Sequence, residues 1–259
     1  MSEPARVVMF SGGIGSWAAA KRVAERHGTD NLTLLFTDTL IEDEDLYRFL
    51  EEAAANVGGK LVRIAEGRTP WQVFRDVKFL GSARGDPCSR ILKREMSNCW
   101  LTDNCDPTNT IVYVGIDWTE AHRYTRLAAR RAEAGWRYEA PLCEAPWLQK
   151  HDMLLMCKED GIAPPRLYAL GFAHNNCGGF CVKAGAGHFA NLLRTLPELY
   201  AHHEAEEAAI QPLLASPQTI LRDRTGGDIK PLSLRALRER IETGWQPDLF
   251  DLGGCGCFL

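Results

Sequence analysis

The sequence predicts an α/β fold, in which a parallel β-sheet is flanked by helices and followed by a mostly helical region that contains cysteines. In the first half, short and strongly apolar segments alternate with helical periodicity, which is typical of a parallel sheet covered on both faces. In the second half, strand signals are sparse. We therefore expect an α/β domain over residues 1–145 and a helical region over residues 146–259.

The elements of the first half follow one another in regular order. Apolar runs predict strands at residues 7–10, 32–36, 61–65 and 111–116. Periodicity of 3.6 residues predicts a helix that starts near Ser16 and further helices at residues 43–57, 70–79 and 89–100. The pair Gly58-Gly59 ends the second of these helices.

The second half carries helical patterns at residues 151–160, 188–196 and 199–209. Residues 213–228 are polar and predict irregular structure, and Ser233 can cap a short helix that follows. Residues 251–259 predict an extended, loosely held tail.

Composition restricts the class of protein. A chain of 259 residues with 45% apolar residues can bury a sizeable core. The formal charge of −4 argues against a strongly basic nucleic-acid surface, although Arg126, Arg130 and Arg131 fall on one expected helix. Without a membrane-length apolar run or a secretion signal, the chain is expected in the cytoplasm and off membranes. Three tryptophans are expected in the core rather than at an interface, and a homodimer stays open: Trp136, Trp147 and Trp245.

A glycine-rich loop directly follows the first strand. Residues 11–16 read S-G-G-I-G-S and lead into a good helix former. A strand, a glycine loop and a helix in this order gather backbone N–H groups that point at an anion. Gly12, Gly13 and Gly15 allow the backbone to approach a phosphate, and the hydroxyls of Ser11 and Ser16 add donors.

This S-G-G-x-x-S loop resembles the pyrophosphate loop of the PP-loop superfamily, also called adenine nucleotide alpha hydrolases, and in particular its phosphoadenylylsulfate (PAPS) reductase-like branch. Gly15 stands where the usual loop has an acidic residue, as in reductase members, and this departure bears on ATP cleavage more than on nucleotide binding. The resemblance implies a Rossmann-like sheet that binds ATP or PAPS at the loop, with Mg²⁺ offsetting phosphate charge.

Polar residues follow the second and fourth strands, at the sheet edge where ligands of open α/β sheets bind. Asp38 either caps a turn or contacts a ligand. With Thr39 it also resembles the Asp-Thr pair of the PAPS reductase branch, which implies contact with ribose, metal or pyrophosphate. The pattern Gly-Ile-x-x-x-Glu-x-x-Arg after the fourth strand resembles the same branch. It implies that Gly115 lies near adenine or phosphate and that Arg123 binds phosphate or sulfate through its planar fork.

Nine cysteines in a cytoplasmic chain indicate metal or redox chemistry rather than disulfides. Cys88 opens an expected helix, where the helix dipole and nearby Lys93 favour its thiolate, although a small buried residue is the alternative. The pattern Cys-Ser-x-x-Leu-Lys resembles PAPS-reductase-like proteins, which implies that Cys88 lies by the nucleotide and that Lys93 faces phosphate.

The strongest cysteine pattern is Cys177-Gly-Gly-Phe-Cys181, whose glycines allow both sulfurs to approach one metal. Together with Cys88, as the resemblance implies, this pair predicts a 4Fe–4S cluster. A zinc site completed by Cys255 and Cys257, or no metal at all, are the alternatives. The remaining cysteines are interpreted as structural: Cys99, Cys105, Cys143 and Cys157.

The predicted function is that of a nucleotide-dependent sulfur-transfer enzyme, which adenylates a substrate with release of pyrophosphate before sulfur from a donor is inserted. A nucleic acid is one candidate acceptor. The first alternative is a PAPS or adenylylsulfate reductase with a thiol reductant, in which Cys255 or Cys257 in the glycine-rich tail attacks sulfur. The Glu-Cys-Gly-x-His signature of true reductases is absent. The second alternative is a non-catalytic nucleotide- and metal-binding module.

Overall fold

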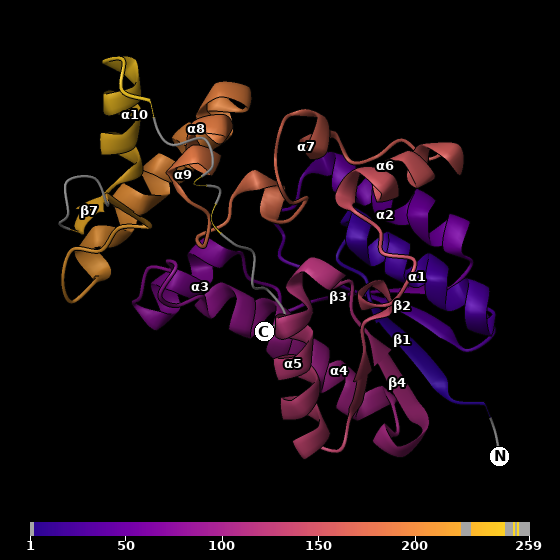
Figure 1. Cartoon of the computed structure of the whole chain (residues 1–259). Coiled ribbons are helices and arrows are strands. Elements are labelled where there is room, and N and C mark those ends of the chain that lie inside the picture. The colour runs from indigo at the N-terminus through magenta and orange to yellow at the C-terminus, as the bar shows by residue number, and fades with distance from the viewer. Residues whose placement is uncertain (1–2, 224–228, 247–250, 252, 254–259) are drawn as a thin grey trace.

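The computed structural model describes residues 3–223, 229–246, 251 and 253. Its centre is a five-stranded, fully parallel sheet with strand order β3-β2-β1-β4-β5 (Figure 1). The strands are β1 (Ala5–Met9), β2 (Leu32–Asp38), β3 (Lys60–Ala65), β4 (Thr110–Tyr113) and β5 (Arg137–Glu139). The structure confirms the predicted α/β class, with a parallel sheet and a helical C-terminal part.

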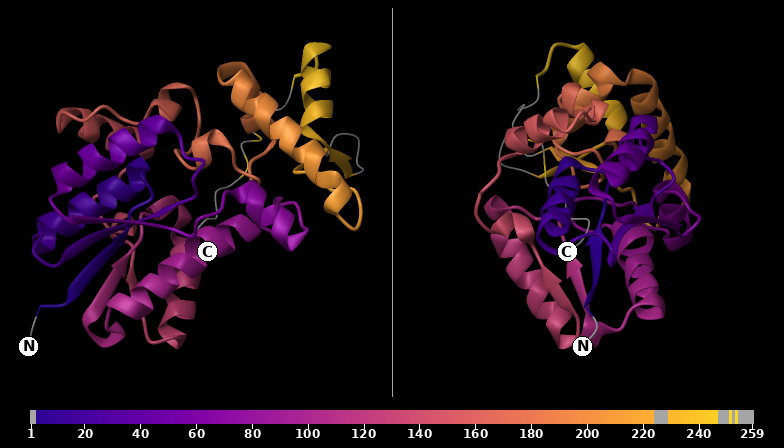
Figure 2. Two further views of the ribbon diagram at one scale, coloured as in Figure 1. Left: turned by 180° about the vertical axis from the view of Figure 1, so that it is seen from behind. Right: turned by 90° about the vertical axis from the view of Figure 1, so that its right-hand side faces the viewer.

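Helices cover both faces of the sheet (Figure 2). Because successive side chains of a strand point to opposite faces, Val8 of β1 packs against one helical layer and Val7 against the other. The first layer is formed by α1 (Ile14–His27), α2 (Glu44–Val57) and α6 (Lys150–Glu159). The second layer is formed by α4 (Met96–Asn104) and α5 (Ala121–Glu133).

Local sequence signals set the ends of several helices. Asp43 caps α2 by accepting a hydrogen bond from the backbone N–H of Asp45 at 3.0 Å, and Gly58 ends this helix with a φ of 84°. Thr69 and Gln72 form a capping box at the start of α3 (Pro70–Val77). The helix expected at residues 89–100 is instead a π-helical segment, Ser89–Glu95, that continues into α4.

A second core lies beside the sheet and is formed mainly by C-terminal helices. Its helices are α7 (Arg166–Ala169), α8 (Ala186–Thr195), α9 (Pro197–Ile210) and α10 (Leu234–Glu242). From the first half of the chain, α3 contributes Trp71 and Phe74 to it. The indole Nε1–H of Trp71 donates to Nδ1 of His203 at 3.0 Å, and the ring of His203 stacks on Phe180 with centroids 3.8 Å apart. Both cores thus include residues from either side of position 145.

Three expectations about the fold are wrong. The expected strand at 111–116 ends at Tyr113, because the chain turns away at Gly115 to pass over the start of α1. The region expected to be irregular, residues 213–228, includes β6 (Leu221–Asp223), which pairs with β7 (Lys230–Leu232). Trp147, expected in the core, is 65% exposed.

The described residues also contain short 3₁₀ turns at Pro107–Asn109, Trp118–Glu120, Pro141–Cys143, Cys177–Gly179 and Gln211–Leu213. Among the described residues, the helices are too short or too polar to cross a bilayer.

Candidate functional site

A cavity of about 380 Å³ opens at the carboxyl edge of the sheet. It lies between the glycine-rich loop, the turn after β4 and the segment at residues 173–176. The loop contributes Ser11, Gly13, Ile14, Gly15 and Ser16. The rest of the lining includes acidic, basic and amide side chains: Asp117, Glu120, Arg123, Lys150, His174, Asn175 and Asn176. A parallel sheet places the ligand sites of such folds at this edge.

The glycine-rich loop presents the start of α1 to this cavity. Gly13 is the N-cap residue and supplies no side-chain cap, and the first turn of α1 contains no acidic residue. The hydroxyl of Ser16 donates to the carbonyl oxygen of Gly13 at 2.8 Å, and Ser11 donates to the Ser16 hydroxyl at 3.3 Å. A helix start of this kind favours an anion, because its backbone N–H groups and the helix dipole act together.

Gly15 and Gly115 bring two backbone segments into contact. A Cβ atom on Gly115 would lie 2.8 Å from the backbone nitrogen of Ser16, closer than such atoms approach one another. A Cβ atom on Gly15 would lie 3.2 Å from the carbonyl oxygen of Gly115. The turn after β4 therefore packs directly on the loop, and the missing side chain at position 15 is part of that packing.

A segment from the second half of the chain holds the loop from the other side. The side-chain amide of Asn175 donates to the carbonyl oxygen of Gly12 at 2.8 Å. The phenolic oxygen of Tyr168 accepts a hydrogen bond from the backbone N–H of Ile14 at 3.1 Å. Neither Tyr168 nor Asn175 was predicted as a site residue, because their contact with the loop joins residues more than 150 positions apart.

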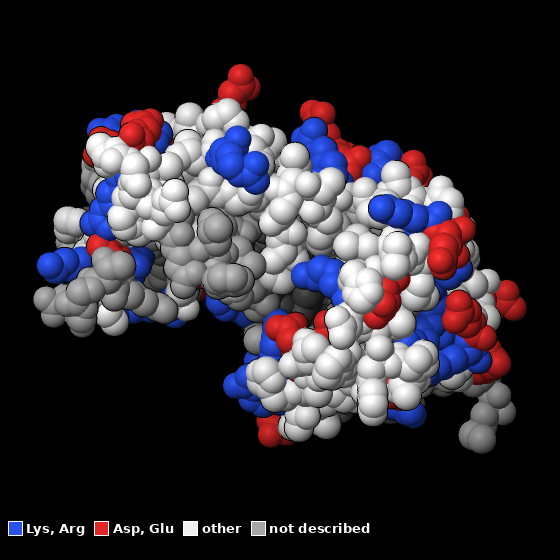
Figure 3. Space-filling view, turned by 45° about the horizontal axis from the view of Figure 1, so that its top comes forward, with Lys and Arg blue, Asp and Glu red and all other residues white. Residues whose placement is uncertain are grey.

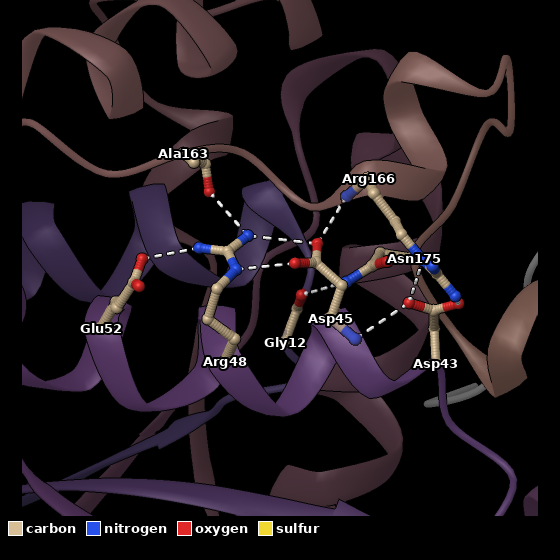
Figure 4. A network of polar contacts seen from close by, with 8 residues as sticks. All are labelled: Gly12, Asp43, Asp45, Arg48, Glu52, Ala163, Arg166 and Asn175. Carbon is tan, nitrogen blue, oxygen red and sulfur yellow. Dashed lines mark hydrogen bonds and ion pairs between the residues drawn. The ribbon is translucent and has the colours of Figure 1, made fainter.

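An ionic network ties this segment to the N-terminus of α2 (Figure 4). The guanidinium of Arg166 donates to both carboxylate oxygens of Asp43, at 2.8 and 2.7 Å. The backbone N–H of Arg166 donates to Asp45 at 2.7 Å. Arg48 on α2 bridges Asp45, Glu52 and the carbonyl oxygen of Ala163 (Figure 4). The segment that carries Tyr168 and Asn175 is thereby fixed to the helix that packs beside the loop.

Two cations, two carboxylates and one histidine are the ionisable side chains of the cavity. Arg123 forms an ion pair with Glu120 on the wall, and the ammonium of Lys150 donates to the carbonyl oxygen of Ala173 at 2.6 Å. Burial, together with the charges of Lys150, His188 and Arg123, lowers the pKa of His174 to about 4. His174 is therefore neutral at physiological pH. The charged groups of the wall are the cations Arg123 and Lys150 and the carboxylates Asp117 and Glu120.

Asp38 and Thr39 lie outside the wall of this cavity. The carboxylate of Asp38 is fully buried and accepts hydrogen bonds from the backbone N–H of Leu40 at 2.8 Å and from the phenol of Tyr47 at 3.0 Å. Arg63 also donates to it. Burial and this carboxylate raise the pKa of the Tyr47 phenol. The predicted contact between Asp38 or Thr39 and a nucleotide stays a prediction.

The predicted cysteines lie together around a second, smaller cavity. Cys88, Cys177 and Cys181 line it with Lys93, and its volume is about 20 Å³. The ammonium of Lys93, only 4% exposed, lies 3.7 Å from the carboxylate of Glu42 and 3.8 Å from the sulfur of Cys177. Lys93, which the resemblance places against phosphate, thus lies beside a cysteine and a carboxylate.

The backbone at Cys177 has an unusual conformation. Cys177, Gly178 and Gly179 have φ values of 54°, 61° and 87°, in the left-handed region that a cysteine rarely adopts. Glu42 accepts the backbone N–H of Cys177 and so helps to hold this conformation. Such strain persists where surrounding contacts over-determine it, and it is concentrated at functional sites.

The space between the three predicted cysteines is small. A cavity of about 20 Å³ has room for one water molecule. Within the residues that the structure describes, no group of three or more His, Cys, Asp or Glu side chains is arranged to hold a metal ion. Ligation of iron or zinc by Cys88, Cys177 and Cys181 stays a prediction. Cys255 and Cys257 lie outside the described residues.

No family model and no curated protein matches the chain. Among solved structures, PAPS reductase from Candida auris, in a phosphate complex, matches with 14% identity and a TM-score of 0.45, over 64% of this chain and 78% of that one. NH3-dependent NAD synthetase from Campylobacter jejuni matches with 13% identity and a TM-score of 0.44, over 95% and 90% of the two chains.

A predicted subunit of tRNA methyltransferase from Methanocaldococcus jannaschii matches with 18% identity and a TM-score of 0.38, over 64% of this chain and 92% of that one. At these identities and scores, the likeness concerns the arrangement of the chain alone.

Proposed function

We propose that the chain is a nucleotide-dependent enzyme that binds ATP, or a sulfonucleotide such as PAPS, in the 380 Å³ cavity. The observation that carries this proposal is the juxtaposition of the glycine-rich start of α1 with Arg123 and Lys150 across the cavity. Backbone N–H groups on one side and two cations on the other suit a chain of phosphates. The volume lies in the range of small-molecule sites.

With ATP, a substrate oxygen would attack the α-phosphate, and the bond to the β-phosphate oxygen would break. The products would be an adenylated substrate and pyrophosphate. Arg123 and Lys150 would stabilise the negative charge that develops on the departing pyrophosphate. A Mg²⁺ ion would offset phosphate charge, and Asp117 and Glu120 are the carboxylates on the cavity wall that would hold it.

We further propose that the reaction is a sulfur transfer, and the position of the cysteines supports this. Asn176 lines the nucleotide cavity and Cys177, the next residue, lines the cysteine pocket. A thiol that carries sulfur from a donor would therefore lie one residue from the nucleotide site. Reduction of a sulfonucleotide is the second candidate, and Gly15, in place of the acidic loop residue, favours it.

Calorimetric titration with ATP and with PAPS, followed by an assay for pyrophosphate and sulfite, tests the proposal. Lys150→Ala should weaken nucleotide binding about ten-fold or more, since a hydrogen bond to a charged group is removed. Lys158→Ala, an exposed lysine on the same helix, is the matched control and should bind as wild type does.

Pyrophosphate release with ATP would support adenylation, and sulfite formation from PAPS would support reduction. Binding without either product would favour the non-catalytic module. Failure of both nucleotides to bind, or equal binding by the Lys150 and Lys158 variants, would overturn the site. Iron, sulfide and zinc analysis of anaerobically purified protein tests the metal prediction separately, with Cys177→Ala as the comparison.

A further inference from the structure

Two exposed tryptophans stand at the rim of the nucleotide cavity. Trp147 is 65% exposed and Trp118 is 39% exposed, and their ring centroids lie 6.4 Å apart. Trp118 lies between Asp117 and Thr119, which both line the cavity, and Trp147 precedes the cavity residue Lys150 by three positions. Large aromatic rings are costly to leave in water, and a pair of them beside a binding site indicates a surface that is covered by a ligand.

The orientation of the Trp118 ring is fixed by a hydrogen bond to the backbone. The indole Nε1–H of Trp118 donates to the carbonyl oxygen of Leu148, at 3.2 Å, in the segment that carries Trp147. The two segments follow β4 and β5, which are neighbours in the sheet. The two rings are inclined at 43° to each other, so each offers its own face on which one planar group can stack.

Basic residues follow the turn Trp118–Glu120 along α5, which begins at the next residue, Ala121, and lies at the front of the molecule in Figure 1. His122, Arg126 and Arg130 are spaced four residues apart, so they share one helix face, and all three are exposed. In the part of the chain that the structure describes, no carboxylate pairs with Arg126 or Arg130, and Glu133 is the acidic residue at the far end of the helix.

The net charge of the protein does not predict a surface that combines Trp118 and Trp147 with Arg126 and Arg130. The net charge is −4, and basic and acidic side chains alternate over the face shown in Figure 3. Most other arginines are neutralised locally: Arg26, for example, pairs with Glu144 at 2.6 Å, three residues before Trp147. The combination of unpaired arginines with neighbouring, exposed aromatic rings is therefore a local property of the rim and α5.

We infer that this surface binds single-stranded nucleic acid, with bases stacked on Trp118 and Trp147 and phosphates on Arg126 and Arg130. Stacking platforms beside cationic side chains are the features by which proteins hold single strands, because every base has a π-face and every nucleotide a phosphate. The inference deepens the proposed function, and rests on it for one point only: a strand bound here would present a base or phosphate to the nucleotide cavity as the acceptor.

Fluorescence anisotropy tests this binding without any nucleotide in the cavity. The probes are fluorescein-labelled single strands of DNA and of RNA, about 16 nucleotides long and of mixed sequence, and the corresponding duplex. Trp147→Ala should weaken single-strand binding about ten-fold or more, because one base no longer has a ring to stack on. Leu213→Ala, which removes an exposed apolar side chain elsewhere, is the matched control and should bind as wild type does.

Salt dependence tests the binding of phosphates. The double variant Arg126→Ala/Arg130→Ala should reduce the slope of log K against log salt by about 0.7 for each phosphate that the variant no longer binds. The double variant Arg90→Ala/Arg235→Ala, which removes two exposed arginines that are paired with Glu95 and Glu204, should leave the slope unchanged.

Several results would overturn the inference: no binding of either strand by wild type, equal binding of wild type and Trp147→Ala, or equal affinity for single strand and duplex. Displacement of the strand by polyglutamate at equal charge concentration would assign the surface to an acidic protein partner instead. Tighter binding of RNA than DNA, or the reverse, would identify the source of the strand. ATP affinity is measured on the same preparations. A protein that binds ATP but no single strand would contradict only this inference, and one that binds the strand but no ATP would contradict only the proposed nucleotide site.

Discussion

The phenolic oxygen of Tyr168 accepts a hydrogen bond from the backbone N–H of Ile14 at 3.1 Å. Ile14 is the first residue of α1, so a side chain from the second half of the chain satisfies one of the N–H groups that the glycine-rich loop exposes. Tyr168 lines the proposed nucleotide cavity as well. Occupation of the cavity by a phosphate would therefore change the hydrogen bonds of a residue that helps to hold the second half in place.

We expect Tyr168→Phe to lower the free energy of unfolding by about 1 kcal/mol, because the N–H of Ile14 loses its acceptor. A bound phosphate would supply another acceptor, so the deficit should shrink at saturating ATP. Urea denaturation with and without ATP measures both values. A deficit that ATP does not change would mean that phosphate does not reach this N–H group.

Gly115→Ala should disrupt the packing of the turn after β4 on the glycine-rich loop. The new methyl group would lie 2.8 Å from the backbone nitrogen of Ser16, so one of two backbone segments must shift. We expect a decrease of about 1–3 kcal/mol in stability and weaker ATP binding. The control is Gly85→Ala, whose methyl group would meet the ring of Phe79 at 3.3 Å. Equal effects of the two changes on ATP affinity would contradict the importance of this packing.

Asp43 should stabilise the start of α2 through two interactions, the helix cap and the ion pair with Arg166, which can be measured separately. Asp43→Ala removes both the helix cap and the paired hydrogen bonds to Arg166, and we expect it to cost about 2 kcal/mol or more. Asp43→Asn keeps a capping oxygen and should cost less. A double-mutant cycle with Arg166→Ala, followed by thermal unfolding, measures the coupling. Additive effects of the two substitutions would show that the ion pair contributes nothing.

His203 should make stability fall in acid. Burial lowers its pKa to about 3, whereas in the unfolded chain the pKa is near 6.5. Between these values the unfolded state binds one more proton, so the free energy of unfolding falls by about 1.4 kcal/mol for each pH unit below about 6.5. His203→Gln should flatten this dependence by one proton in urea titrations at pH 7, 6 and 5.

The neighbouring residue provides the control for that experiment. His202 is exposed, and His202→Gln should retain the acid sensitivity of wild type. If the His203→Gln variant kept the full pH dependence, the sensitivity would have to come from other buried histidines, of which His188 is one with a lowered pKa.

Much of the fold could be predicted from the sequence because its signals are local. The glycine run at residues 11–16 and the capping residue Asp43 specify helix starts through their own backbone conformations and side chains. The three-residue strand β5 could not be predicted in this way, because so short a strand is defined by pairing with β4 rather than by periodicity. The prediction that Trp147 lies in the core was wrong for a related reason, because apolar character does not by itself specify burial.

In the candidate site, too, residues of local motifs could be predicted, whereas residues that the fold brings together could not. Residues that belong to a motif, such as Gly13, Gly15 and Arg123, could be predicted as site residues from the sequence, and all three line one cavity. Lys150, Tyr168 and Asn175 reach that cavity from distant parts of the chain and belong to no spacing pattern. The position of Lys93 beside Cys177 could not be foreseen either, because it depends on the approach of two residues that are 84 positions apart.

The packing of α3 has a consequence for synthesis of the protein. Trp71 and Phe74 are made early, yet their apolar partners, including Phe180, Phe189 and Tyr200, emerge from the ribosome more than a hundred residues later. At ribosomal rates of about 5–20 residues per second, this helix is exposed for several seconds before its core can close. A nascent chain that has already formed its sheet would thus still present an uncovered aromatic surface, and chaperones that bind such surfaces would meet the chain at this helix.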